Sequence, residues 1–104
     1  MSRPTVIHIR TAPKGWESNP AYVYIGRAGK GQSGDFGNPF QVGHFTLAEA
    51  LTRYAIYLEH RLKTDPVFRE KVKQLSGKTL VCFCKPHDCH GDILASWCEY
   101  LNQN

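Results

Sequence analysis

Apolar and polar residues alternate in three short stretches of this chain, and each stretch predicts a β-strand. The first runs from Thr5 to Arg10. The second, from Ala21 to Ile25, is rich in aromatic and β-branched residues. The third runs from Lys78 to Cys84, and its alternate side chains point to opposite faces. The pattern therefore indicates a three-stranded sheet.

Apolar residues recur at helical spacing in three other stretches. Thr46 and Glu49 form a capping box that starts a helix reaching to about residue 62. Asp65-Pro66 is typical of the N-cap and first position of a second helix, and Gly77 of its end. A third helix, for which Asp88 is the expected N-cap, is predicted from one apolar stripe formed by Ile93, Leu94, Trp97, Cys98 and Leu101.

The predicted order of elements, β-β-α-α-β-α, is that of an α/β protein. The helices between the second and third strands make a crossover long enough for those strands to be parallel. Only ten residues join the first two strands, so these are expected to be antiparallel neighbours or to lie apart in the sheet. We therefore expect one small, three-layer-like α/β domain over residues 1–104, with a three-stranded mixed sheet flanked by helices.

Composition narrows the class of protein. The chain has 104 residues, of which 41% are hydrophobic and 21% charged, as in an ordinary globular domain. No apolar signal segment follows Met1 and no stretch is long enough to cross a membrane, so a cytosolic location and reduced cysteines are expected. The net charge of +4 favours anionic partners.

A polar cluster of reactive side chains lies where the third strand gives way to the third helix. Cys84 ends the strand, and Cys89, His90, Gly91 and Asp92 follow at the helix start. Free N–H groups and the positive dipole end of a helix favour anions and lower the pKa of a thiol. Cys89 is therefore the candidate nucleophile, with His90 or His87 as base and Asp92 orienting a histidine.

A second unusual stretch, from Gly26 to Gly43, contains six glycines and directly follows the second strand. Long loops of this kind are often functional. Ligands of open α/β sheets bind outside the carboxyl ends of parallel strands, so this loop and the Cys-His turn are expected to meet. The resulting pocket would bind a small anionic, nucleotide-related ligand through Gly26, Arg27, Gly37, Asn38 and Cys84.

The sequence as a whole resembles a known family. Ile25-Gly26-Arg27, Gly37-Asn38-Pro39-Phe40, Asp65-Pro66, Cys82-Phe83-Cys84-Lys85-Pro86 and Cys89-His90-Gly91-Asp92 are similar to the motifs of domain of unknown function 4326, a family of bacteria and their phages. Phe83 stands where that family more often has Trp. A more distant likeness is to domain of unknown function 488, in which an Arg usually stands at the position of Gly91. Neither resemblance implies an activity.

Other interpretations of the cysteines stay open. Cys84, Cys89 and His90, with Cys82 or His87, have the atom types of a zinc site, although their spacing is irregular and Cys89 and His90 are adjacent. The cysteines are equally compatible with a buried core, the simplest role for Cys98. No cofactor is therefore assigned, and whether the chain is an enzyme is left undecided.

The alternative from another class is an accessory module that contacts nucleic acid or a host protein. Its surface would be a basic group on the first two helices, formed by Arg61, Lys63, Arg69, Lys71 and Lys73. Nucleic acid is the less favoured partner, because this group has no recognised binding motif and no interleaved aromatic residues. A small sheet with exposed edges is also compatible with a homodimer.

Overall fold

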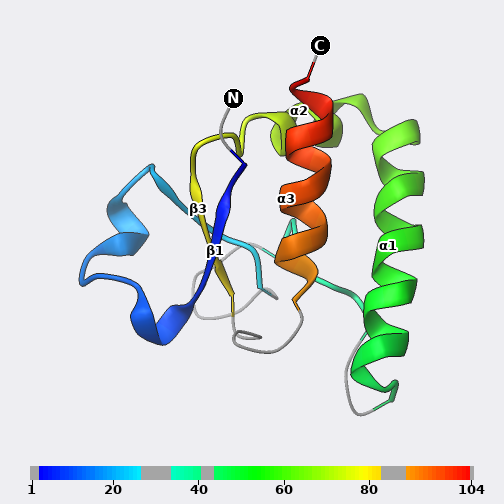
Figure 1. Cartoon of the computed structure of the whole chain (residues 1–104), viewed down its shortest axis with the longest axis horizontal. Helices are drawn as coiled ribbons and strands as arrows, with labels where there is room; N and C mark the ends of the chain where they lie inside the picture. Colours follow the sequence, from blue (N-terminus) through cyan, green and yellow to red (C-terminus); the bar gives the residue numbers. More distant parts are fainter. Residues whose placement is uncertain (1–2, 27–33, 41–43, 83–88, 104) are drawn as a thin grey trace.

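The structure, a computed structural model, describes residues 3–26, 34–40, 44–82 and 89–103. It contains three strands, three α-helices and two 3-10 helices (Figure 1). In chain order these are β1 (Thr5–His8), η1 (Ile9–Thr11), η2 (Trp16–Ser18), β2 (Tyr22–Tyr24), α1 (Leu47–Thr64), α2 (Pro66–Lys73), β3 (Thr79–Cys82) and α3 (His90–Leu101). The predicted order β-β-α-α-β-α is confirmed.

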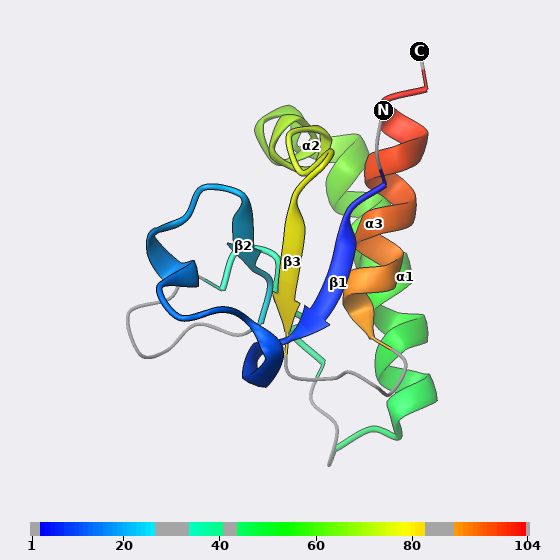
Figure 2. The same cartoon turned by 60° about the vertical axis from the view of Figure 1, so that its left-hand side comes forward.

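The sheet has the order β1-β3-β2, and both pairings are parallel. The prediction of a mixed sheet is therefore wrong, whereas the alternative that β1 and β2 lie apart is confirmed. The physical reason is the path of residues 9–21. Instead of turning back as a hairpin, they form η1 and η2 on one face of the sheet and bring the chain back to the start of a parallel strand (Figure 2). β3 then pairs between β1 and β2.

Local sequence signals explain the helix ends. The Thr46 side chain accepts a hydrogen bond from the Glu49 N–H, and the Glu49 carboxylate accepts one from the Thr46 N–H, so the predicted capping box is present. Asp65 caps α2 through the Phe68 N–H at 3.0 Å. Beyond α2, Gly77 has a φ of 77°, a left-handed conformation that glycine adopts at little cost.

The core lies between the sheet and the helices. Figure 1 shows α3 and α1 on one side of the sheet and residues 9–21 on the other. The buried cluster on the helical side comprises Ile25, Tyr54, Leu58, Leu62, Phe68, Val72, Leu75, Leu80, Cys82, Cys89, Leu94 and Cys98. On the other side Trp16 is buried, with its ring centroid 6.4 Å from that of Tyr24. This face of the sheet is therefore covered as well.

Parallel pairing brings the carboxyl ends of all three strands to one edge of the sheet. The amino-terminal end of α3 lies at the same edge, at the bottom of Figures 1 and 2. Within the described ranges, none of the helices combines the length and apolar character needed to cross a membrane. The edge of the sheet where a ligand is expected to bind is thus also the edge at which the polar cluster at the start of α3 lies.

Candidate functional site

Cys89 is the residue that starts α3. It has extended backbone angles, φ −133° and ψ 142°, and its Sγ accepts a hydrogen bond from the Gly91 N–H at 3.3 Å. The prediction of Asp88 as N-cap is therefore wrong, because the thiol one residue later takes that place. Cys89 is only 2% exposed, so this cap lies inside the protein. The sulfur therefore accepts a main-chain N–H at the positive dipole end of a helix.

The neighbouring His90 is also buried, at 5% exposure. Its Nε2 lies 2.6 Å from the carbonyl oxygen of Ile25, directly after β2. A carbonyl can only accept, so Nε2 carries the proton and donates it in this hydrogen bond. In the neutral ring Nδ1 is then the acceptor, and it lies 3.9 Å from Sγ of Cys89. The contact with Ile25 therefore selects the tautomer in which His90 can receive the thiol proton.

A second thiol completes the buried cluster. Sγ of Cys89 lies 3.2 Å from Sγ of Cys82, the last residue of β3. Sγ of Cys82 in turn lies 3.4 Å from the carbonyl oxygen of Ile7 in β1. The two thiols and the imidazole thus connect the carboxyl ends of all three strands to the start of α3. Among the sequence interpretations, only the zinc site would have brought Cys82 close to Cys89.

Glycines let the backbone segments of this edge come close together. A Cβ at Gly37 would lie 2.8 Å from the carbonyl oxygen of Gly26, and a Cβ at Gly91 would lie 2.6 Å from Cδ1 of Ile25. Real Cβ atoms essentially never approach so closely. The Cys-His turn thus contacts Ile25, one residue before the Gly26 stretch, and Gly37 of that stretch lies against Gly26. Arg27 lies outside the described residues.

Tyr54 of α1 adds a contact to the candidate site that sequence reasoning missed. Its ring packs edge-on against the His90 ring, with centroids 5.2 Å apart, and its hydroxyl donates a hydrogen bond to the Phe36 carbonyl at 3.0 Å. Burial raises the pKa of the Tyr54 phenol, and nearby Tyr57 and Cys89 raise it further. The phenol therefore stays protonated as a donor. Its partners belong to the segment before α1 and to the start of α3, so the sequence of α1 alone could not predict this contact.

Other predicted ligand residues have structural partners. The Asn38 amide donates to the Ala50 carbonyl of α1 at 3.2 Å and so holds residues 34–40 against that helix. Its oxygen accepts from the Phe40 N–H at 2.9 Å, a bond within the segment itself. Asp92 lies in the first turn of α3, but the Ile25 carbonyl orients the His90 ring. Cys84 and His87 lie outside the described residues.

Metal and basic-surface interpretations can be compared with the same geometry. Among the residues that the structure describes, no three His, Cys, Asp or Glu side chains are grouped so that they could hold a metal ion.

In the predicted basic group, Arg61 and Lys71 both contact the carboxylate of Asp35, at 3.4 and 2.7 Å. The Arg61 guanidinium also lies 3.7 Å from the ring centroid of Phe68. Two of the five basic side chains therefore stabilise the fold.

A cavity of about 440 Å³ lies away from the Cys-His turn, beside the edge strand β2 and the end of α2. Its two lysines have protein partners: Lys71 contacts Asp35, and Lys78 donates to the Pro20 carbonyl at 2.9 Å. Tyr22 and Tyr24 form part of the wall. The cavity is thus separate from the thiol cluster.

Comparison with known proteins shows which family this chain belongs to. An uncharacterized 12.4 kDa protein in the nrdA-td intergenic region of Enterobacteria phage T4 is 43% identical over 35 residues, a stretch that covers 34% of this chain and 32% of the phage protein. No solved structure matches the chain. The family model described as a domain of unknown function (DUF4326) matches residues 7–100, which include the strand ends, Cys82, Cys89 and His90. The chain therefore belongs to the DUF4326 family.

Proposed function

We propose that this protein binds a small anionic ligand of the nucleotide class at the carboxyl edge of its parallel sheet, with Cys89 and His90 as the groups that act on it. The single observation that carries the proposal is the 2.6 Å hydrogen bond between His90 Nε2 and the Ile25 carbonyl. It joins the end of β2 to the start of α3 and leaves Nδ1 facing the thiol. Pairing of a nucleophile with an oriented base is the arrangement used in thiol catalysis.

The position of the site, at the carboxyl edge of the sheet, supports the proposal that the ligand is an anion. Ligands of open α/β sheets bind outside the carboxyl ends of the strands, and here the N-terminus of a twelve-residue helix lies at that edge. Arg27 follows Gly26 in the sequence, directly after the segment that His90 contacts, and is the nearest cation along the chain. The net charge of +4 also favours anions. The ligand would lie above the buried thiol, against the Gly26 and Gly37 backbone.

The first experiment is a binding titration with AMP, ADP and ATP, with adenosine and inorganic phosphate measured beside them. Isothermal calorimetry or ligand-observed NMR of the full chain should detect at least one of the phosphorylated compounds. We expect adenosine to bind more weakly, because the anion is what the helix start recognises. If none of the nucleotides and no phosphate binds at low salt, the proposal is wrong.

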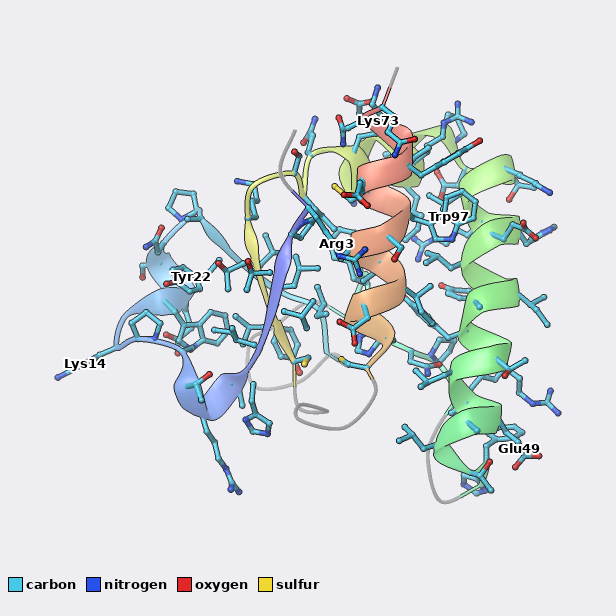
Figure 3. All side chains as sticks on the ribbon, in the orientation of Figure 1. Arg3, Lys14, Tyr22, Glu49, Lys73 and Trp97 are labelled. Carbon is cyan, nitrogen blue, oxygen red and sulfur yellow. The ribbon has the colours of Figure 1, made fainter. Side chains whose placement is uncertain are left out.

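Two variants test the residues. Arg27→Ala should abolish nucleotide binding, whereas Lys14→Ala, which removes the same charge from a side chain that points away from the molecule (Figure 3), should not. His90→Gln keeps an N–H donor that can reach the Ile25 carbonyl but removes the Nδ1 acceptor. It should therefore stay folded by circular dichroism, still bind the nucleotide, and lose any turnover. If Arg27→Ala and Lys14→Ala bind equally well, the anion lies elsewhere.

A further inference from the structure

Two thiol side chains, Cys89 at the start of α3 and Cys82 at the end of β3, form one hydrogen-bonded chain with two main-chain groups. The Gly91 N–H donates to Sγ of Cys89, Cys89 contacts Sγ of Cys82 at 3.2 Å, and Cys82 contacts the Ile7 carbonyl at 3.4 Å. Neither thiol belongs to a disulfide bond, and both are buried. The ligand proposal uses Cys89 and leaves Cys82 without a chemical role.

The distance between the two sulfur atoms is what makes this pair unusual. A disulfide bond is about 2.05 Å long, so the atoms must approach by only about 1.2 Å to form one. Neither thiol has to leave the core, because the pair is already in contact across the end of β3 and the cap of α3. Cys98, the third free cysteine of the described residues, contacts the Lys73 carbonyl and lies on another part of α3.

We propose that Cys82 and Cys89 form a reversible disulfide when the protein meets a small hydroperoxide. Cys89 reacts first, because Nδ1 of His90, 3.9 Å away, can receive its proton and the Gly91 N–H donates a hydrogen bond to the sulfur that remains. The thiolate attacks one peroxide oxygen, the O–O bond breaks, and Cys89 becomes a sulfenic acid while hydroxide leaves and takes a proton to become water. This sulfur is oxidised and the peroxide is reduced.

Cys82 then resolves the intermediate. Its sulfur attacks Sγ of Cys89, the S–O bond breaks, and a second water leaves with the thiol proton of Cys82. Overall, two thiols and one hydrogen peroxide give one disulfide and two waters. A small oxidant suits the site, since Cys82 is 0% exposed and Cys89 2% exposed. Reduction by an external dithiol reverses the change.

The disulfide would alter the cap of α3 and the candidate site together. In the bonded state Cys89 has no thiol to give His90 a proton, and its sulfur is a weaker acceptor for the Gly91 N–H. Formation of the bond does not depend on ligand binding, so this inference stands apart from the proposed function. Failure of the nucleotide titration would leave it untouched.

The experiment treats the reduced full chain with hydrogen peroxide under native conditions, blocks remaining thiols with N-ethylmaleimide, and measures the intact mass. We expect a loss of two hydrogen atoms and two alkylated cysteines fewer than in the untreated chain. Trypsin alone cannot locate the bond, because the chain has no cleavable Lys or Arg between Thr79 and Asn104, Lys85 being followed by Pro86. Chymotrypsin after Phe83 together with cleavage before Asp88 and Asp92 puts Cys82, Cys84 and Cys89 on separate fragments.

Variants then decide between the possible pairs. Cys82→Ser and Cys89→Ser should each lose the cross-link, whereas Cys84→Ser and Cys98→Ser should keep it. Cys89→Ser keeps a capping side chain at the start of α3, so its fold can be checked by circular dichroism. A bond between Cys84 and Cys89, a sulfinic acid on Cys89 with no cross-link, or no change of mass would each overturn the proposal. So would oxidation of Cys98 at the same rate, since the oxidant would then be reaching an unfolded chain.

Discussion

Individual residues at the start of α3 serve the fold and the candidate site at once. Cys89 caps the helix and contacts Cys82, and His90 fills a buried position while its ring joins β2 to α3. Gly91 allows the helix to lie directly against the side chains of Val6 and Ile25. A change at any of these positions therefore alters packing as well as chemistry.

Replacing Gly91 by Ala should destabilise the protein. The new Cβ would lie 2.6 Å from Cδ1 of Ile25 and 2.8 Å from Cγ1 of Val6. Overpacking of this kind costs about 1–3 kcal/mol, and the better helix propensity of Ala returns at most about 1 kcal/mol. We expect the free energy of unfolding in urea, followed by circular dichroism, to fall by up to about 2 kcal/mol once this return is subtracted. Ser96→Ala, on the exposed side of α3, is the control and should leave stability unchanged or slightly higher. Equal stability of Gly91→Ala and the parent would contradict the close packing.

At the scale of single residues, the sequence predicted which residues form the cluster. It did not predict their burial or the groups that they contact. The cluster Cys89, His90 and Asp92 at a helix start was predicted from spacing alone. The burial of His90 was not, because its partner is the carbonyl of Ile25, sixty-five positions away. The contact between Cys82 and Cys89 depends on the path of the connecting chain, which side-chain patterns do not specify.

Elements are held together by a few side chains that reach between them. Asp35, in the segment before α1, accepts a hydrogen bond from Lys71 of α2 at 2.7 Å and contacts Arg61 of α1 at 3.4 Å. Hydrogen bonding and charge from Lys71, with help from Arg61, lower the pKa of the Asp35 carboxyl. This acid therefore joins two helices and the segment that carries Gly37.

The contribution of Asp35 should depend on pH. Its folded pKa lies below the unfolded value, so the stabilisation is present above the unfolded pKa, near 4, and is lost as the pH falls through the folded pKa. All three side chains are partly exposed, so the effect is under about 1 kcal/mol. Asp35→Asn should be slightly less stable than the parent at pH 7 in urea unfolding, and the difference should shrink as the pH falls below about 4. Glu59→Gln, exposed on α1, is the control; a constant difference for Asp35→Asn down to pH 2 would contradict the ion pairs.

Residues close together in the sequence determine where the elements begin and end, and these were predicted well. Contacts between residues far apart in the sequence determine how the elements are arranged. The sequence could predict the helix ends, because each end signal involves only residues within about one turn. These signals are the capping box at Thr46, the cap at Asp65 and the stop at Gly77. Strand order depends on pairings across some seventy positions, such as Thr5 with Thr79. The sequence could not predict that residues 9–21 would cross one face of the sheet and leave β3 in the centre.

The whole molecule has packed layers on both faces of its sheet. Trp16 is buried on the face covered by residues 9–21, whereas Trp97 projects from α3 toward α1 in the view of Figure 3 and packs against the helical core. The central strand β3 contacts both layers, since Leu80 belongs to the helical core and Val81, its neighbour, is also fully buried. Both layers therefore depend on one strand.

This arrangement predicts that the chain unfolds as one cooperative unit. Trp16→Phe and Trp97→Phe each leave a single tryptophan, one in each layer. In both variants the fluorescence midpoint in urea should coincide with the midpoint by far-ultraviolet circular dichroism, because neither layer can separate from β3 without losing the core. An earlier fluorescence transition in Trp97→Phe, in which Trp16 reports, would show that residues 9–21 detach first.

The anchor of the His90 ring is part of the main chain, and this has an evolutionary consequence. A carbonyl oxygen is present whatever side chain stands at position 25, so mutation of that residue cannot remove the acceptor as long as the strand keeps its course. Aligned relatives should therefore show no pairwise covariation between positions 25 and 90. The orientation of the His90 imidazole is therefore preserved as long as the backbone fold is preserved. Selection at position 25 then acts on the volume of its side chain and not on this hydrogen bond.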